Sequence, residues 1–126
     1  MVKINIKPDC GNSPRKVFLK DLYTSFAYGN FEILYNNVEE NLNWIVAGQS
    51  ALKGKENYIK EIARHKLWKA KEITVDTIIT HGAEASVSGT IKATDNLKYV
   101  FCDIYKFKGA GGTTITSIMT FLVQQD

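Results

Sequence analysis

Two long apolar segments near the end of the sequence, Tyr99–Phe107 and Thr113–Val123, constrain the fold more than any other feature. Both are rich in β-branched and aromatic residues, and a glycine-rich run separates them. This pattern predicts a long β-hairpin with a loop at its tip. Side chains two positions apart on a strand share a face, so Asp103 points the same way as Phe101 and Tyr105. The hairpin therefore places a carboxylate on an apolar face, either as a hydrogen-bonded core residue or as the centre of a pocket.

Length and composition predict one globular domain. The chain has 126 residues, of which 44% are hydrophobic and 23% charged, and this is enough for a single core. A net charge of +3, spread along the chain, is too small to predict nucleic-acid binding. Cys10 and Cys102 match neither a disulfide framework nor a zinc spacing, and no segment has the pattern of a signal peptide or membrane span. We therefore expect a cytoplasmic protein with no metal, no cofactor, no nucleic-acid partner and no membrane partner.

Apolar residues at helical spacing predict three helices in the first half of the chain. The first is expected over about 14–28, where a serine and a proline mark its start and a glycine follows its end. Shorter helices are expected over 31–38 and 54–67. Residues 1–13 form an extended segment whose alternation is compatible with a short edge strand. We place the single domain at 14–126.

Alternating apolar and polar residues predict the strands. One strand is expected at 42–46, followed by a loop over 49–53. A second, over 73–80, has four residues of one parity expected on one face: Ile73, Val75, Thr77 and Ile79. A third, over 84–94, alternates almost without fault and leads into the final hairpin, so the last four strands form a meander. Helices that precede an antiparallel sheet predict an α+β domain with the helices on one face.

Four segments carry a resemblance to a known family: Gly29-Asn30-Phe31-Glu32, Trp44-Ile45-Val46-Ala47-Gly48, Leu52-Lys53-Gly54-Lys55-Glu56 and Asp103-Ile104-Tyr105-Lys106-Phe107. In this order and spacing, over about residues 14–124, the chain resembles the nuclear transport factor 2-like superfamily, in particular its SnoaL-like and ketosteroid-isomerase-like branch. The resemblance implies a cystatin-like cone, in which three N-terminal helices pack in a strongly curved, mixed, mainly antiparallel sheet. It also implies a ligand cavity at the open end and, in many members, a homodimer formed through the outer sheet face.

The resemblance carries over only part of the ketosteroid isomerase site. Those enzymes use a carboxylate base, a tyrosine on the first helix and a protonated acid that donates to the developing oxyanion. Asp103 matches the oxyanion acid. The tyrosine position falls on Leu22, with Tyr23 about 100° away around the helix. The base position falls on Ile45, Val46 or Ala47, and none of these residues can take a proton.

Asp103 is the candidate catalytic or ligand-contacting residue. If it is buried without a cation, desolvation should raise its pKa. His65 or His81 could assist it, as polar residues assist the pocket acid of polyketide cyclases, only if the fold brings them together. The walls of the expected pocket are apolar and aromatic and suit a flat or cyclic apolar ligand: Leu22, Phe26, Trp44, Val46, Tyr58, Phe101, Tyr105, Ile118 and Thr120.

Two classes of function remain open. The first is a small-molecule-binding pocket protein without catalysis, which the missing base favours. The second is an isomerase, cyclase or hydratase acting on a small apolar or cyclic substrate with Asp103 as acid or base, and it requires a second polar group in the cavity. A partner-docking scaffold has no specific residue in its favour. Outward parity on the hairpin predicts an apolar homodimer interface formed by Val100, Cys102, Ile104, Ile115, Met119 and Phe121.

Overall fold

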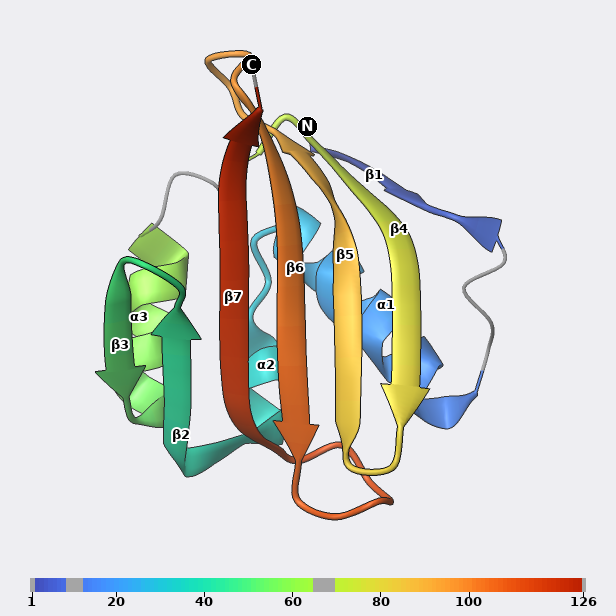
Figure 1. Ribbon diagram of the computed structural model, residues 1–126, viewed down its shortest axis with the longest axis vertical. Coiled ribbons are helices and arrows are strands. Elements are labelled where there is room, and N and C mark those ends of the chain that lie inside the picture. Colours follow the sequence, from blue (N-terminus) through green and yellow to red (C-terminus); the bar gives the residue numbers. More distant parts are fainter. Residues whose placement is uncertain (1, 9–12, 65–69, 126) are drawn as a thin grey trace.

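The computed structural model describes residues 2–8, 13–64 and 70–125 (Figure 1). In chain order the elements are β1 (Lys3–Ile6), α1 (Pro14–Ala27), α2 (Glu32–Asn37), β2 (Val38–Val46), β3 (Ser50–Lys53), α3 (Lys55–Arg64), β4 (Glu72–His81), β5 (Glu84–Lys92), β6 (Lys98–Phe107) and β7 (Ile115–Gln125). The α+β class and the final hairpin are as predicted, whereas β3 forms where a loop was expected. The expected end of the third helix, 65–67, lies outside the described residues.

All the described strands belong to one sheet, in the order β1-β4-β5-β6-β7-β2-β3. Strands β4 to β7 form the predicted antiparallel meander, and β3 is antiparallel to β2. Strand β1 runs parallel to β4, and β2 runs parallel to β7. The sheet is therefore mixed and mainly antiparallel, as predicted, and it is curved rather than closed. Figure 1 shows α1 and α2 behind the meander and α3 behind β2 and β3, so the helices lie on one face.

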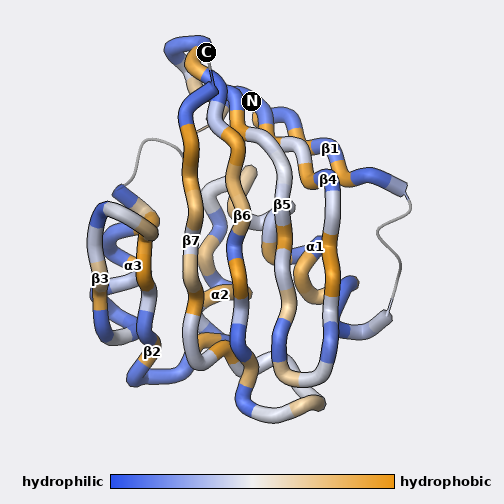
Figure 2. Tube along the Cα trace, viewed as in Figure 1, coloured by the Kyte–Doolittle hydropathy of each residue, from blue (hydrophilic) through white to orange (hydrophobic). Residues whose placement is uncertain are grey.

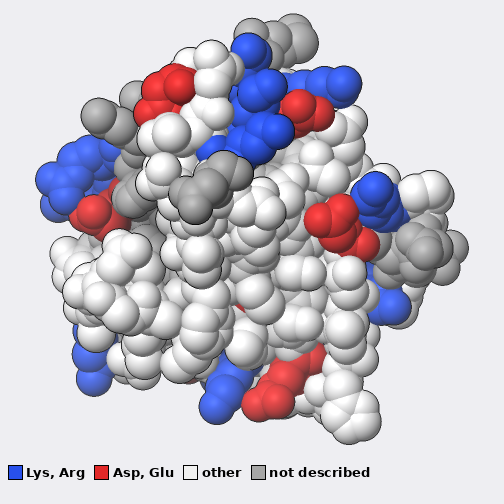
Figure 3. Space-filling model, turned by 45° about the horizontal axis from the view of Figure 1, so that its top comes forward, with Lys and Arg blue, Asp and Glu red and all other residues white. Residues whose placement is uncertain are grey.

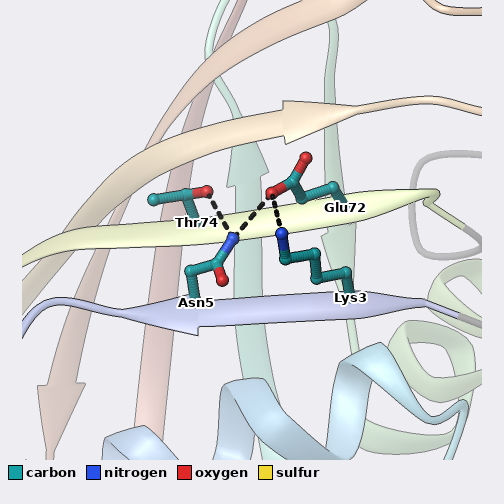
Figure 4. A network of polar contacts seen from close by, with 4 residues as sticks. All are labelled: Lys3, Asn5, Glu72 and Thr74. Atoms are coloured by element: carbon teal, nitrogen blue, oxygen red, sulfur yellow. Dashed lines mark hydrogen bonds and ion pairs between the residues drawn. The ribbon is translucent and has the colours of Figure 1, made fainter.

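The N-terminal strand β1 is held in the sheet by a polar network (Figure 4). Asn5 Nδ2 donates to Glu72 Oε2 at 2.7 Å and to Thr74 Oγ1 at 3.4 Å. Lys3 Nζ lies 3.9 Å from the same Glu72 oxygen. The apolar residues of β1 pack against the hydrophobic core. Residues 3–6 thus continue the sheet of the domain that follows them.

Strand β4 contains a β-bulge, which changes the face that its side chains occupy. Its pairing with β5 shifts register between Val75 and Thr77, so one extra residue enters β4 at this point. Thr77 and Ile79, which were expected on the same face as the buried Ile73 and Val75, are exposed, and Ile78 is buried instead. The prediction was wrong here because a bulge reverses the parity of every residue that follows it.

Gly89 on β5 lies opposite this bulge and allows the two strands to approach closely. It pairs with Val75, and a Cβ atom at Gly89 would lie 1.8 Å from the backbone oxygen of Thr74 and 3.1 Å from Phe101 Cε1. A side chain of any size would therefore push β4 away from β5. Bulges and inward-facing glycines are the usual devices that bend a sheet, and here they curve it around the core.

The hydrophobic core lies between the helices and the sheet. Figure 2 shows hydrophobic stretches along β4, β6 and β7, interrupted by more hydrophilic positions, and hydrophilic residues at the C-terminal end of β7. Ile115 was predicted on the outer face but is fully buried, at 0% exposure. The register between β6 and β7 shifts between Lys106 and Phe107, and this shift turns Ile115 inward. No helix in the described part of the chain is long and apolar enough to cross a membrane.

Candidate functional site

A cavity of about 280 Å³ opens between strands β2, β3, β5, β6 and β7 and helix α3. Its described apolar lining residues are Trp44, Val46, Leu52, Ile91, Phe101 and Leu122. Its described polar lining residues are Gln49, Ser50, Glu61, Asp103 and Thr120. The volume is at the small end of the roughly 300–1,000 Å³ range of ligand pockets, so the cavity suits a compact ligand.

The buried and exposed lining residues define the inner end and the mouth of this cavity. Asp103 is only 2% exposed and Thr120 is also buried, whereas Gln49 and Ser50 are exposed. Glu61 is intermediate, with 37% of its side chain exposed. A ligand that enters past the amide, hydroxyl and carboxylate groups at the mouth would meet the Asp103 carboxyl group at the inner end.

Two chains of hydrogen bonds converge on Asp103. On one side Trp44 Nε1 donates to Thr120 Oγ1 at 3.0 Å, and Thr120 Oγ1 donates to Asp103 Oδ1 at 2.7 Å. On the other side the Tyr23 hydroxyl donates to Asp103 Oδ2 and lies 2.7 Å from the Tyr105 hydroxyl. Tyr23 has a single hydroxyl proton, so when it donates to Asp103 it must accept from Tyr105. The carboxylate is therefore the final acceptor of both chains.

The fold places these groups through strand pairing and helix packing. Asp103 pairs directly with Thr120 across β6 and β7, and Thr120 pairs with Val46 on β2. Tyr23 comes from α1 and stacks on Phe101, with ring centroids 5.8 Å apart and planes 17° from parallel. The site is thus built where the hairpin, strand β2 and the first helix meet.

Burial is the main influence on the acidity of these groups. It raises the pKa of Asp103 to about 6, although the hydrogen bonds from Tyr23 and Thr120 act in the opposite direction. Burial and the nearby Asp103 charge raise the pKa of Tyr23, Tyr58 and Tyr105 well above the ordinary value. These tyrosines keep their protons near neutral pH, so Asp103 is the group among these four that changes charge in the physiological range.

The structure divides the expected pocket residues into two groups. Five of them line the cavity: Trp44, Val46, Phe101, Asp103 and Thr120. The other five are buried in the core and are not among the described lining residues: Leu22, Phe26, Tyr58, Tyr105 and Ile118. Tyr58 packs edge-on against Trp44 with ring centroids 4.9 Å apart, so this member of the second group supports the cavity wall from behind.

Two polar residues near the site were not predicted to belong to it. Tyr23, rather than a residue at the position of Leu22, brings a helix hydroxyl to Asp103. Glu61 lines the cavity and accepts a hydrogen bond from Arg64 Nη2 at 2.5 Å. A signal for Glu61 was present, because it lies one turn after the buried Tyr58 on α3 and so borders the inward face of that helix.

His81 is not placed at the cavity. His81 is exposed at the end of β4, where it lines a separate surface depression with Arg15 and Gly112. Arg15 donates to the backbone oxygens of Gly82 and Gly112 there, which ties together the loops at this end of the sheet. His65 lies outside the described residues. Among the residues that the structure describes, no group of three or more histidine, cysteine, aspartate or glutamate side chains could hold a metal ion.

No protein-family model matches the chain, and no curated protein matches it. Solved structures do match. A nuclear transport factor 2-like protein of unknown function from Cytophaga hutchinsonii is 20% identical with a TM-score of 0.68, and the match covers 86% of this chain and 99% of that one. Another such protein, from Burkholderia xenovorans, is 12% identical with a TM-score of 0.74 and coverage of 90% and 89%.

A further solved structure also matches. A putative SnoaL-like polyketide cyclase from Jannaschia sp. is 11% identical with a TM-score of 0.68, and the match covers 89% of this chain and 90% of that one. At these identities the likeness concerns the fold. The chain has the nuclear transport factor 2-like fold, as its sequence resemblance implied.

Proposed function

We propose that this chain binds a small apolar or cyclic molecule in the cavity at Asp103, without catalysing its conversion. The observation that carries this proposal is the position of an ionisable carboxyl group, 2% exposed, at the inner end of a cavity with apolar walls. Burial of an ionisable carboxyl group without a described counter-charge is unfavourable for the folded protein. Contact between a ligand and the Asp103 carboxylate would account for the burial of this group.

The absence of a base at the ketosteroid isomerase position supports binding rather than that reaction. Of the residues at this position, Val46 lines the cavity and Ile45 is exposed on the outer face of the sheet. Proton abstraction next to a carbonyl needs a base within hydrogen-bond reach of the carbon acid. Neither side chain can supply one, so we expect no efficient ketosteroid isomerisation.

An acid–base enzyme is the second candidate, and Glu61 is the observation in its favour. This carboxylate lines the same cavity as Asp103 and would supply the second polar group that an isomerase, cyclase or hydratase requires. The fold likeness to a putative polyketide cyclase fits this candidate as well. Turnover that Asp103→Asn and Glu61→Gln each reduce by roughly 10²-fold or more would favour it over binding alone.

Retention of a ligand from a metabolite extract tests the binding proposal. The purified protein is incubated with the extract and recovered, and the molecules it retains are identified by mass spectrometry. Leu122→Trp fills the cavity, whereas Val123→Trp alters the neighbouring residue, which is 63% exposed. We expect a compound retained by the wild type and by Val123→Trp but not by Leu122→Trp. If the wild type retains nothing that Leu122→Trp lacks, the proposal is wrong.

We further propose that the outer sheet face pairs with a second copy of the chain. Val100, Met119 and Phe121 are exposed on this face, beside the half-buried Cys102 and Ile104. Figure 3 shows charged residues around the edge of the face and uncharged side chains over its middle. An apolar area of this kind is costly for a monomer to leave in water.

Sedimentation at micromolar concentration tests the pairing. The wild type should sediment as a dimer, and Phe121→Lys should sediment as a monomer because it buries an unpaired charge in the interface. Tyr28→Lys is the control, since Tyr28 is exposed at the end of α1. A monomeric wild type would overturn the pairing and leave the cavity proposal unaffected.

We also propose that the protein is cytoplasmic. Cys102 is a free thiol on the outer sheet face, and burial raises its pKa above the ordinary value, which makes it a poor nucleophile. An unreactive thiol that has no disulfide partner suits a reducing compartment.

A further inference from the structure

The charges that line the cavity are all of one sign in the part of the chain that the structure describes. The ionisable lining residues there are Asp103 and Glu61, and lysine, arginine and histidine are absent from that described lining. Glu61 at the mouth is paired with Arg64 at 2.5 Å. Asp103 at the inner end has two hydroxyl groups as partners and no described cation. The uncompensated charge is therefore at the inner end.

The other titratable groups that the structure describes near Asp103 do not compensate its charge. Tyr23 on α1, Tyr58 on α3 and Tyr105 on β6 are buried, and their pKa values are raised, so they are neutral. Cys102, the adjacent residue on β6, also has a raised pKa and remains a thiol. Among the described residues, hydrogen bonds from Tyr23 and Thr120 are what stabilise an ionised Asp103, in a setting where burial disfavours charge.

The carboxylate keeps the capacity to bind a donor from the cavity. Each carboxylate oxygen has two lone pairs, and each oxygen of Asp103 accepts one hydrogen bond, from Tyr23 or from Thr120. The apolar walls next to it include Phe101 and Trp44. The inner end therefore offers a negative charge, free acceptor positions and aromatic surface to one small group.

We propose that the ligand is a compact apolar molecule that carries one cationic amine, with its ammonium group against Asp103 and its apolar body against Phe101, Trp44 and Leu122. This inference rests on the proposed function and names the ligand class of the same cavity. An ammonium group supplies the counter-charge that the described cavity lining lacks and makes charge-assisted hydrogen bonds, which are about twice as strong as neutral ones. A carboxylate or phosphate ligand would face like-charge repulsion in a site partly shielded from water.

Three probes that share one ring system and differ in the charge of their substituent separate the effect of ligand charge on affinity from the effect of ligand shape. They are 2-naphthylmethylamine, 2-naphthalenemethanol and 2-naphthoate, and their dissociation constants are measured by titration calorimetry at about pH 7.5, where an ordinary amine is protonated. We expect the amine to bind roughly tenfold or more tightly than the alcohol, and the naphthoate to bind most weakly. Leu122→Trp should abolish binding of the amine, and Val123→Trp should preserve it.

The pH dependence of binding identifies the carboxylate involved. Because burial raises the pKa of Asp103 to about 6, the affinity for the amine should fall as the pH is lowered through this value and the carboxylate takes up a proton. Asp103→Asn should remove both the preference for the amine and this pH dependence. Asp21→Asn, which removes an exposed carboxylate on α1 outside the cavity lining, should retain both.

The outcomes distinguish the ligand class from the binding function. Binding of naphthoate as tight as that of the amine, lost in Leu122→Trp, would overturn the amine inference and support small-molecule binding in the cavity. Failure of all three probes to bind at millimolar concentration would count against the amine inference and against small-molecule binding in the cavity. If Asp103→Asn does not fold, the comparison of the three probes on the wild type still decides the ligand class.

Discussion

The hydroxyl group of Tyr23 donates a hydrogen bond to the carboxylate of Asp103, joining helix α1 to strand β6 across 80 residues of sequence. Tyr23→Phe removes this bond and leaves the ring stacked on Phe101. Since the bond favours the ionised carboxylate, the pKa of Asp103 should rise above 6. Loss of a hydrogen bond to a buried charged group should also cost about 1–3 kcal/mol of unfolding free energy. Urea unfolding measures this cost, with Tyr28→Phe at the exposed helix end as the control.

Asp103 should make the protein less stable as the pH rises from about 4 to about 7. Its pKa is about 6 in the folded protein and about 3.9 in an unfolded chain, so between these values the folded state binds more protons. The free energy of unfolding rises with pH only where the unfolded state binds more protons than the folded state. Here the folded state binds more, so stability falls as the pH rises. A shift of about two units corresponds to about 3 kcal/mol.

Unfolding free energies of the wild type and Asp103→Asn at several pH values check this dependence. The wild type should lose about 3 kcal/mol relative to the variant as the pH rises from about 4 to about 7. Asp21→Asn, exposed on α1, controls for removal of a surface charge. A difference that stays constant, or that grows in favour of the wild type with pH, would contradict burial of an uncompensated carboxylate.

Gly89→Ala should be strongly destabilising. Its Cβ would lie 1.8 Å from the backbone oxygen of Thr74, and the strands must separate to relieve this contact. Overpacking of a core typically costs about 1–3 kcal/mol, and a clash with backbone belongs at or above the upper end of this range. Gly111→Ala is the matched control, because a Cβ there meets nothing within 4 Å. Equal melting temperatures for the two variants would show that the bulge does not require a glycine.

Asn5→Ala should destabilise the protein more than Lys3→Ala. The Asn5 amide makes partly buried hydrogen bonds to Glu72 and Thr74, whose loss costs about 1 kcal/mol. Lys3 contributes an exposed ion pair at 3.9 Å, and pairs of this kind contribute little. Thermal unfolding compares the two variants. A larger effect of Lys3→Ala would mean that charge rather than the amide network holds β1 in the sheet.

The alternation of apolar and polar residues predicted correctly which side chains are buried in strands that have no bulge. In β5 the buried residues Ala85, Val87 and Ile91 follow the predicted parity throughout, because no bulge interrupts this strand. In β4 and at the start of β7 the parity failed at register shifts. A bulge depends on the curvature of the whole sheet, which a local pattern of residues does not contain.

The candidate site was predictable in its strand residues and less so in its helix residues. Strand parity brought Asp103 and Thr120 to the same cavity, because directly paired residues share a face. On α1, the resemblance placed the family's tyrosine position at Leu22, and both Leu22 and Tyr23 are buried. Neighbouring residues differ by about 100° around a helix, and the rotation of α1 about its axis, which decides which one reaches Asp103, depends on packing against the sheet. Glu61 reaches the cavity through the same kind of packing.

The pH titration of the Asp103 carboxyl group, followed by carbon-13 NMR with selectively labelled aspartate and assigned with Asp103→Asn, tests the central claim most directly. A buried carboxyl group without a counter-charge should titrate near 6, and addition of 2-naphthylmethylamine should lower this value because the ammonium group stabilises the ionised form. A pKa at or below the ordinary value of about 3.9 would contradict the claim, since it would place Asp103 in water or beside a cation.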